Sequence, residues 1–180
     1  MDTIIRYIIG EIGDGDFDPN FIPPINIDDY HVRKASRGVL IRGDKCALLY
    51  VSKENYHKLP GGGIESGESN EDAFRRELRE ETGCDCKVDN EDGQNSVVLE
   101  TRDQFKLFQI SYIFFAEVVG EPKELKLEQS EIDEGFELQW IPLDKAIETL
   151  KKDEPKNYEG KFIQKRDLNV LRFYKDKLNT

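Results

Sequence analysis

The sequence predicts a single α/β domain in which helices are inserted between the strands of one sheet. The chain has 180 residues, which is long enough to bury a substantial core. Apolar residues make up 37% of it and charged residues 35%, the balance of a globular protein rather than a disordered one. Runs of β-branched and aromatic residues alternate along the chain with segments that carry helix start and stop signals, which is typical of a layered α/β fold.

The first 31 residues are predicted to form an N-terminal extension that packs on or beside the main domain, residues 32–180. Residues 1–9 fit a short strand and a short helix equally well, because two apolar pairs flank Arg6 and Tyr7. The segment that follows is rich in glycine, proline and aspartate, so we expect a loop at residues 10–24.

The spaced aspartates of this loop resemble a calcium-binding loop at first sight. Two positions exclude that interpretation. Pro19 stands where such a loop needs glycine, and Ile25 stands where it needs a bidentate glutamate. We therefore expect a solvated acidic turn rather than a metal site in this part of the chain.

Two apolar runs predict a β-hairpin near the start of the main domain. They span Val39–Ile41 and Cys46–Val51, and a turn centred on Gly43 and Asp44 separates them. Both runs are continuous rather than alternating, so the two strands should be buried deep in the sheet. A short strand is expected next, at His57–Leu59.

A helix is predicted between Ser69 and Gly83. Ser69 is a good N-cap residue, and Asp72 stands three residues later in the capping-box position. Gly83 supplies the usual C-terminal stop. Phe74 and Leu78 offer a small apolar contact face, so the helix should be mostly polar and anchored by few side chains.

The remainder of the chain predicts four strands and two helices. The strands are expected at residues 85–88, 96–102, 105–119 and 136–141, with an acidic turn at 89–93 and an acidic loop at 120–135. Pro142 should begin a helix at 143–150, and a C-terminal helix is expected at 161–178, with Ile163, Val170 and Tyr174 on its inner side.

The overall charge limits the classes of partner. The net charge is −11, from 26 basic and 37 acidic residues. This balance argues against general binding to DNA or to an anionic membrane, both of which require a basic surface. An anionic small-molecule substrate would need metal ions or local lysine and arginine side chains.

Cysteine usage and the apolar segments predict a cytoplasmic protein. Cys46, Cys84 and Cys86 are odd in number and too few for a disulfide framework, which fits a reducing compartment. Cys84 and Cys86 have no histidine nearby and do not predict a zinc site. The start of the chain shows no signal-peptide pattern. The longest apolar run, Ile110–Ala116, is far too short to span a membrane.

The predicted helix at Ser69–Gly83 carries an unusual concentration of acid. Glu77, Glu80 and Glu81 fall within one narrow arc, because residues at i, i+3 and i+4 are neighbours on a helix surface. Three like charges side by side destabilise an isolated helix, so a cation is expected on this face. Carboxylate oxygens suit hard divalent ions such as Mg²⁺ or Mn²⁺.

This helix and the glycines before it fit the Nudix box, G-x5-E-x7-R-E-U-x-E-E-x-G-U, where U is a bulky aliphatic residue. The matching positions are Gly62, Glu68, Arg76, Glu77, Leu78, Glu80, Glu81 and Gly83. Cys84 departs from the pattern at the last aliphatic site, which should affect packing rather than chemistry. Over residues 32–150 the chain resembles the MutT-like Nudix hydrolases, with no subfamily identified.

The resemblance implies a Nudix α/β/α sandwich with a mixed central sheet. It also implies a pyrophosphohydrolase that uses Mg²⁺ or Mn²⁺ to cleave the diphosphate bond of a nucleoside diphosphate linked to a group X. The substrate would be a nucleoside triphosphate, ADP-ribose or a nucleotide sugar. By the family pattern, Glu77, Glu80 and Glu81 are the catalytic residues and the metal ligands, with the backbone carbonyl of Gly62 as a further ligand. Arg76 and Glu68 would brace the site.

The residues expected to contact the substrate are Gly61, Gly62, Gly63, Tyr56 and Lys58. Other aromatic and basic side chains could stack on a base or attract phosphates, although structural roles are the more common explanation for such residues. This wider group is Phe105, Phe108, Tyr112, Lys53, Arg102 and Lys106. His31 and His57 show no catalytic partner pattern.

Several alternatives stay open at this stage. The general base is Glu77 or one of three acids in the predicted loop, Glu128, Glu131 and Glu134. A Nudix-like module that senses a nucleotide without cleaving it is a second functional class, and an isomerase of the same fold is a third. The chain lacks the proline beyond the box that marks many ADP-ribose enzymes, and it has no NADH or coenzyme A motif. Whether the protein forms a homodimer is not determined by the sequence.

Overall fold

The structure is a computed structural model that describes residues 7–24, 26–89 and 96–180. Within these residues the strands are β1 (Tyr7–Gly13), β2 (His31–Arg42), β3 (Lys45–Val51), β4 (Tyr56–Lys58), β5 (Gly61–Gly63), β6 (Asp85–Val88), β7 (Ser96–Arg102), β8 (Leu107–Val119) and β9 (Phe136–Pro142). The α-helices are α1 (Asn70–Thr82), α2 (Gln129–Glu134), α3 (Leu143–Lys152) and α4 (Tyr158–Leu178), and short 3-10 turns occupy Asp14–Asp16 and Asp103–Phe105.

All the strands belong to one mixed sheet, as the sequence predicted. The order is β1-β7-β8-β2-β3-β4, and β5, β6 and β9 pair with β2, β8 and β3 respectively. The β1–β7 and β2–β8 pairs are parallel, and the other pairs are antiparallel. The long β2–β8 pair runs from His31 opposite Leu107 to Ile41 opposite Glu117 and forms the centre of the sheet.

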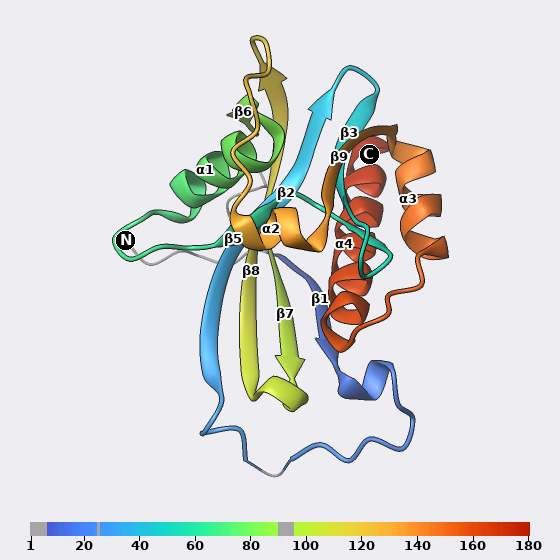
Figure 1. The fold of residues 1–180 in the computed structure, drawn as a ribbon. Helices are drawn as coiled ribbons and strands as arrows, with labels where there is room; N and C mark the ends of the chain where they lie inside the picture. Colours follow the sequence, from blue (N-terminus) through green and yellow to red (C-terminus); the bar gives the residue numbers. More distant parts are fainter. Residues whose placement is uncertain (1–6, 25, 90–95) are drawn as a thin grey trace.

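Helices cover both faces of the sheet, with α1 on one side and α3 and α4 on the other (Figure 1). On the first face, Phe74 of α1 stacks on Phe114 of β8, with ring centroids 5.0 Å apart. On the second face, Val39 of β2 belongs to the same buried cluster as Phe162 and Val170 of α4. The α/β/α sandwich is therefore confirmed.

Local signals in the sequence placed most of these elements correctly. The hairpin is confirmed, with Ile41 opposite Cys46 across the predicted turn. Helix α1 begins after Ser69, whose hydroxyl accepts the backbone N–H of Asp72 at 3.1 Å. It ends at Gly83, which takes the left-handed conformation with φ of 70°. The C-terminal helix begins three residues earlier than predicted, at Tyr158.

One prediction was wrong, since the segment at 120–135 is not entirely a loop. Residues Gln129–Glu134 form the short helix α2, which ends at Gly135 with φ of 72°. The chain before it is held against the end of α1 by two backbone hydrogen bonds. Lys123 N–H donates to the carbonyl of Gly83 at 2.7 Å, and Lys126 N–H donates to the carbonyl of Glu80 at 2.8 Å.

The described part of the N-terminal segment joins the sheet. Residues 7–13 form a strand rather than a helix, and β1 runs parallel to β7 at the edge. The division of the chain at residue 31 stays a prediction. Residues 1–6 and Ile25 lie outside the described residues, as does the acidic turn expected at 89–93 apart from Asp89.

A buried network of charges joins β7 to α4 beneath the second face. Glu100 of β7 is fully buried and pairs with two arginines: Arg102 Nη2 lies 2.7 Å from its Oε1, and Arg166 Nη1 of α4 lies 3.4 Å from its Oε2. Arg166 also pairs with Asp167 at 2.7 Å. Because a buried charge without a partner is costly, breaking this network should destabilise the fold.

Replacing Glu100 with glutamine should destabilise the protein in a pH-dependent way. Burial alone would raise the pKa of Glu100, but Arg166 and Arg102 outweigh it and lower that pKa from 4.5 to about 2. A carboxyl whose pKa is lower in the folded state stabilises the fold above its unfolded pKa, and this contribution is lost as pH falls through the folded pKa. Urea unfolding should therefore show the largest stability difference between wild type and E100Q above pH ~5, shrinking toward pH ~2. A difference that stays constant over this range would contradict the assignment.

Candidate active site

The acidic face of α1 points into the fold rather than into solvent. Glu81 is fully buried, and Glu77 is only 9% exposed. One carboxylate oxygen of Glu81 accepts the backbone N–H of Gly61 at 2.6 Å, and the other accepts Lys58 Nζ at 3.0 Å. The last turn of α1 is thereby attached directly to β4 and to the glycine strand β5.

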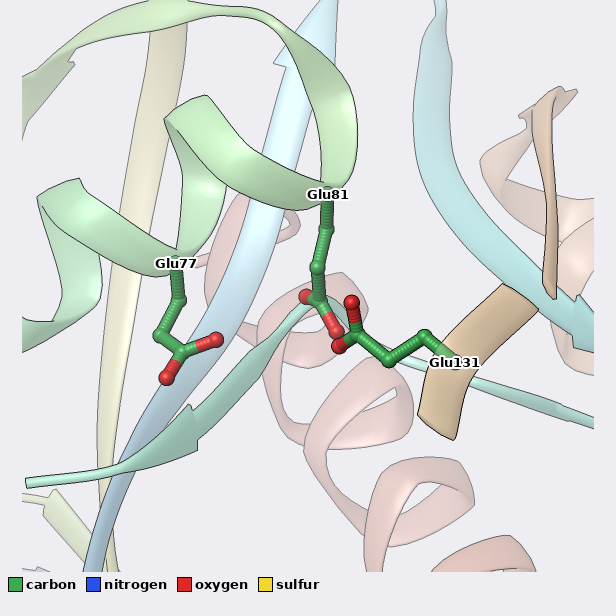
Figure 2. A group of neighbouring side chains, drawn as sticks. All are labelled: Glu77, Glu81 and Glu131. Atoms are coloured by element: carbon green, nitrogen blue, oxygen red, sulfur yellow. The ribbon is translucent and has the colours of Figure 1, made fainter. Parts of the chain in front are cut away.

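Three carboxylates from two helices come together at this point. Oxygen atoms of Glu77, Glu81 and Glu131 all lie within 4.8 Å of one another. Figure 2 shows Glu77 and Glu81 projecting from α1, and Glu131 projecting from α2 with its carboxylate beside that of Glu81. The segment predicted as an acidic loop thus contributes a member of the group, through the helix that the sequence did not reveal.

Glu80 is not part of this three-carboxylate group. Its Oε2 lies 3.2 Å from Nη1 of Arg76, which is the pairing expected for residues one helical turn apart. The same nitrogen lies 2.9 Å from Glu77, and Nε of Arg76 lies 2.9 Å from Glu68. Arg76 also donates to the carbonyl of Gly63 at 2.9 Å, so it braces both the helix and the glycine strand.

The glycines of β5 are required by close approaches at the site. A Cβ on Gly62 would lie 2.5 Å from Oε1 of Glu77, inside the space that the carboxylate occupies. A Cβ on Gly61 would lie 2.3 Å from the carbonyl of Ser36 on β2, and its φ of 135° also favours glycine. Only residues without side chains can let the backbone run this close to the acids of α1.

Burial makes the carboxylates of the site difficult to ionise. It raises the pKa of Glu81 to about 7, although Lys58 and the Gly61 N–H oppose the rise. Burial also raises the pKa of Glu77, against the influence of Arg76. Both groups therefore lie in an environment where a bound cation would be strongly favourable, because it would offset the charge that water no longer solvates.

The residues present fit a hard divalent cation. Their donors are oxygen atoms only, they come from two helices that face each other, and the missing side chain at Gly62 leaves the backbone within reach of the same point. Oxygen-only sets of this kind match Mg²⁺ or Mn²⁺ rather than zinc. The three cysteines are free and buried, and none of them belongs to the group.

A pocket of about 430 Å³ opens beside the three-carboxylate group. The substrate-contact residues predicted from the sequence, Tyr56, Lys58 and the glycines 61–63, all line it. Of the wider group, Arg102 also lines the pocket, whereas Tyr112 is packed in the core on the α1 side. Lys53, Phe105, Phe108 and Lys106 are not among the lining residues.

Sequence reasoning did not single out several residues of the pocket wall. These are Arg33 and Arg37 of β2, Gln109 of β8, and Arg166 of α4. A signal was present in the sequence, because Arg37 stands two residues before Val39, the start of an apolar run, and would share its face of a strand. Charged side chains inside a sheet need partners or a function.

Comparison with known proteins identifies the family. Residues 32–163 match the family model of the NUDIX domain. The chain belongs to the Nudix hydrolase family. The family match and a relative named as a hydrolase place the chain among enzymes, and the family implies hydrolysis of the pyrophosphate bond in nucleoside diphosphate derivatives. The expected resemblance is thereby confirmed over most of the chain.

Individual relatives are distant from this Nudix hydrolase. A protein named "Uncharacterized Nudix hydrolase YvcI", from Bacillus subtilis (strain 168), is 29% identical over 122 residues, which cover 65% of this chain and 77% of the relative. A crystal structure of a UDP-X diphosphatase is similar with a TM-score of 0.53 and 20% identity, covering 82% of this chain and 64% of that one. This Nudix chain thus spans less than two thirds of the diphosphatase. A NUDIX hydrolase from Nitrosomonas europaea gives a TM-score of 0.55 and 19% identity, over 76% and 88% of the two chains. These likenesses show a shared fold.

Among the described helices of this Nudix hydrolase, none is long and apolar enough to cross a membrane.

Replacing Gly62 with alanine should weaken metal binding with little loss of stability. The new methyl group would occupy the space of the Glu77 carboxylate, and a flexible side-chain end can move away without disturbing the fold. We expect the affinity for Mn²⁺, measured by calorimetry, to fall by about tenfold or more. The matched control is Gly63→Ala, whose Cβ would meet only Nη2 of Arg33 at 3.4 Å. Equal affinities for the two variants would contradict the assignment.

Proposed function

We propose that this Nudix hydrolase is a metal-dependent pyrophosphohydrolase acting on nucleoside diphosphates linked to a group X, with Mg²⁺ or Mn²⁺ as cofactor. The observation that carries the proposal is the convergence of Glu77, Glu81 and Glu131 within 4.8 Å at the edge of a 430 Å³ pocket. The pocket also has cationic side chains on its wall, which suits an anionic diphosphate.

In this proposal Glu77, Glu81 and Glu131 hold the cation, and the carbonyl of Gly62 is a further ligand. A divalent ion bound there would neutralise charge on the diphosphate and lower the pKa of a water molecule. Glu80 points toward Arg76 instead. We propose that Glu80 contributes less than its two neighbours, through a second ion or through Arg76.

The remaining residues position these groups. Lys58 donates to Glu81 and offsets its negative charge inside the fold. Arg76 contacts Glu68, Glu77 and Glu80, so it separates acids that would otherwise repel one another. Ordered carboxylates of this kind reduce the reorganisation that a reaction would otherwise require.

The proton acceptor is proposed to come from α2 or from its N-cap residue, Glu128. Glu128, Glu131 and Glu134 all line the pocket. Since Glu131 belongs to the three-carboxylate group, Glu128 and Glu134 are the remaining pocket-lining glutamates of this region and our candidates to accept a proton from water. Comparing E128Q with E134Q would identify which of them does so.

Activity on a substrate panel would distinguish a hydrolase from a sensor of nucleotides. Nucleoside triphosphates, ADP-ribose, dinucleoside polyphosphates and nucleotide sugars would be incubated with Mg²⁺, and phosphate products would be measured. We expect turnover of at least one class and loss of that turnover with EDTA. Binding without turnover of any compound would favour the sensor.

Neutralising Glu81 or Glu131 should reduce kcat strongly and leave the fold intact. E81Q and E131Q each remove one charge from the cation-binding group, so we expect losses of about 100-fold or more in kcat. E80Q should lose less than either. The matched control is Glu124→Gln, an exposed acid in the segment before α2 that does not line the pocket. Circular dichroism would check folding, and near wild-type activity of E81Q would rule out the proposed site.

A further inference from the structure

The sheet face covered by α4 is divided into an apolar half and a polar half. On β2, side chains two residues apart share a face, so Arg37 and Arg33 continue the row that begins with Val39 of the core. On β8, Ser111 and Gln109 continue the row that begins with Ile113. The apolar half packs against α4, and the polar half carries the arginines and Gln109 that form a wall of the pocket.

Two other arginines of this wall already have carboxylate partners. Arg102 lies 2.7 Å from Glu100 and 2.7 Å from Glu159. Arg166 lies 2.7 Å from Asp167 and 3.4 Å from Glu100. Their positive charges are therefore compensated within the protein, and they need no ligand for that purpose.

Arg33 and Arg37 are different, because neither forms an ion pair with any residue that the structure describes. Arg33 donates from Nη1 to the amide oxygen of Gln109 at 2.7 Å. Arg37 donates from Nε to the hydroxyl of Ser111 at 3.3 Å. Both partners are neutral groups, so neither guanidinium on this wall is directly paired with a carboxylate of the described residues.

The terminal nitrogens of Arg37 face the pocket. The residue as a whole is only 4% exposed, and its side-chain hydrogen bond, to Ser111, uses Nε alone. Among the described residues, the hydroxyl oxygen of Ser36 is the side-chain atom that is fully buried and has no hydrogen-bond partner. The Nη atoms of Arg37 also have no partner but are not fully buried. They are therefore accessible, through the pocket that Arg37 lines.

The electrostatic environment of Arg37 favours an anion. Burial, together with the neighbouring charges of Arg166 and Arg33, lowers the pKa of Arg37 to about 9, while Asp167 and Glu100 counteract only part of this effect. At neutral pH the group is still charged. A buried charge that lacks a paired counter-ion is costly, and an anion in the pocket would reduce that cost.

The glycine strand places these arginines next to the three-carboxylate group. Arg37 is directly opposite Gly61 in the β2–β5 pair, and Gly61 is the residue whose N–H binds Glu81. Arg33 extends toward the other end of the same strand, because its Nη2 would lie 3.4 Å from a Cβ on Gly63. One pocket beside this strand is lined by both arginines and by Glu77 and Glu131, so a ligand in it would meet guanidinium groups and carboxylates.

We propose that Arg33 and Arg37 form an anion subsite. It binds a phosphoryl group of the substrate, one that lies beyond the diphosphate held at Glu77, Glu81 and Glu131. This inference rests on the proposed function and narrows it. The preferred X group then carries phosphate, as in nucleoside triphosphates and other compounds with three or more linked phosphates. Nucleotide sugars with an uncharged sugar are disfavoured.

The chemistry of the wall supports phosphate as the ligand. Guanidinium groups are the side chains that most often bind phosphate, because their fork of N–H donors matches its oxygens, and both arginines line the same pocket. The pocket offers little to an uncharged ring. Tyr56 is 4% exposed, and the ring of Phe136 is covered by Lys58 Nζ at 4.6 Å from its centroid.

The first experiment measures anion binding without any metal. Calorimetry with inorganic tripolyphosphate in EDTA would compare wild type with R37M and R33Q. We expect saturable binding by wild type and losses of about 10- to 100-fold in the variants. The matched control is Arg42→Gln, at the end of the same strand, outside the pocket and paired with Glu121. Absence of binding by wild type, or equal binding by R37M, would overturn the subsite.

R33Q serves as a second variant because Arg33 is an exposed residue whose replacement should not affect folding. If R37M fails to fold, as judged by circular dichroism, R33Q alone decides the binding comparison. Unchanged tripolyphosphate affinity in R33Q would then count against the subsite, and a loss confined to R33Q and absent from R42Q would support it.

The second experiment measures selectivity in turnover with Mg²⁺. The compounds would be UTP, UDP-glucose and UDP-glucuronate, which differ in whether X carries phosphate, no charge or a carboxylate. We expect R37M to lower kcat/KM for UTP at least tenfold more than for UDP-glucose. A selective loss for UDP-glucuronate would show a carboxylate subsite, and equal losses for all three would show that Arg37 binds the scissile diphosphate; both results overturn the proposal.

The two experiments separate this inference from the proposed function. If wild type turns over none of the compounds but binds tripolyphosphate through Arg37, the hydrolase proposal fails and the anion subsite stands. If turnover is normal but insensitive to R37M and R33Q, the hydrolase proposal stands and the subsite fails.

Discussion

The buried carboxylate of Glu81 is the contact on which the site depends. It lies at the end of α1, and its two oxygens accept the N–H of Gly61 and the ammonium group of Lys58. A single side chain thus joins the helix, the glycine strand and β4. The arrangement opposes stability, since burial raises the pKa of Glu81 to about 7. The protein retains a carboxylate that resists ionisation at a position where a cation would be bound.

The glycine strand is supported from the opposite side by α4. The N–H of Leu59, just before β5, donates to Asp167 Oδ2 at 2.8 Å. Asp167 is held by Arg166, and Arg166 is held in turn by Glu100 of β7. The chain entering β5 is therefore fixed from both faces of the sheet. The two hydrogen bonds from the N–H groups of Leu59 and Gly61 anchor the backbone next to the close approach of Gly62 to Glu77.

Local signals determined what could be predicted. The ends of α1, the hairpin and the proximity of Glu77 to Glu81 follow from capping, turn chemistry and helix geometry, all of which act over a few residues. Helix α2 and the role of Glu131 could not be predicted in this way. The helix has six residues with no buried side chain, and the preceding segment is held by distant carbonyl groups of α1. Arg37 was missed because its surroundings come from β8 and α4.

The central claim is that Glu77, Glu81 and Glu131 together form a cation site. Anomalous diffraction from crystals soaked in Mn²⁺ tests it most directly, because the signal locates the ion without assuming any activity. We predict one strong peak within bonding distance, about 2.0–2.3 Å, of carboxylate oxygens from all three residues. A peak elsewhere on the protein, or a peak contacting Glu80 but neither Glu81 nor Glu131, would contradict the account.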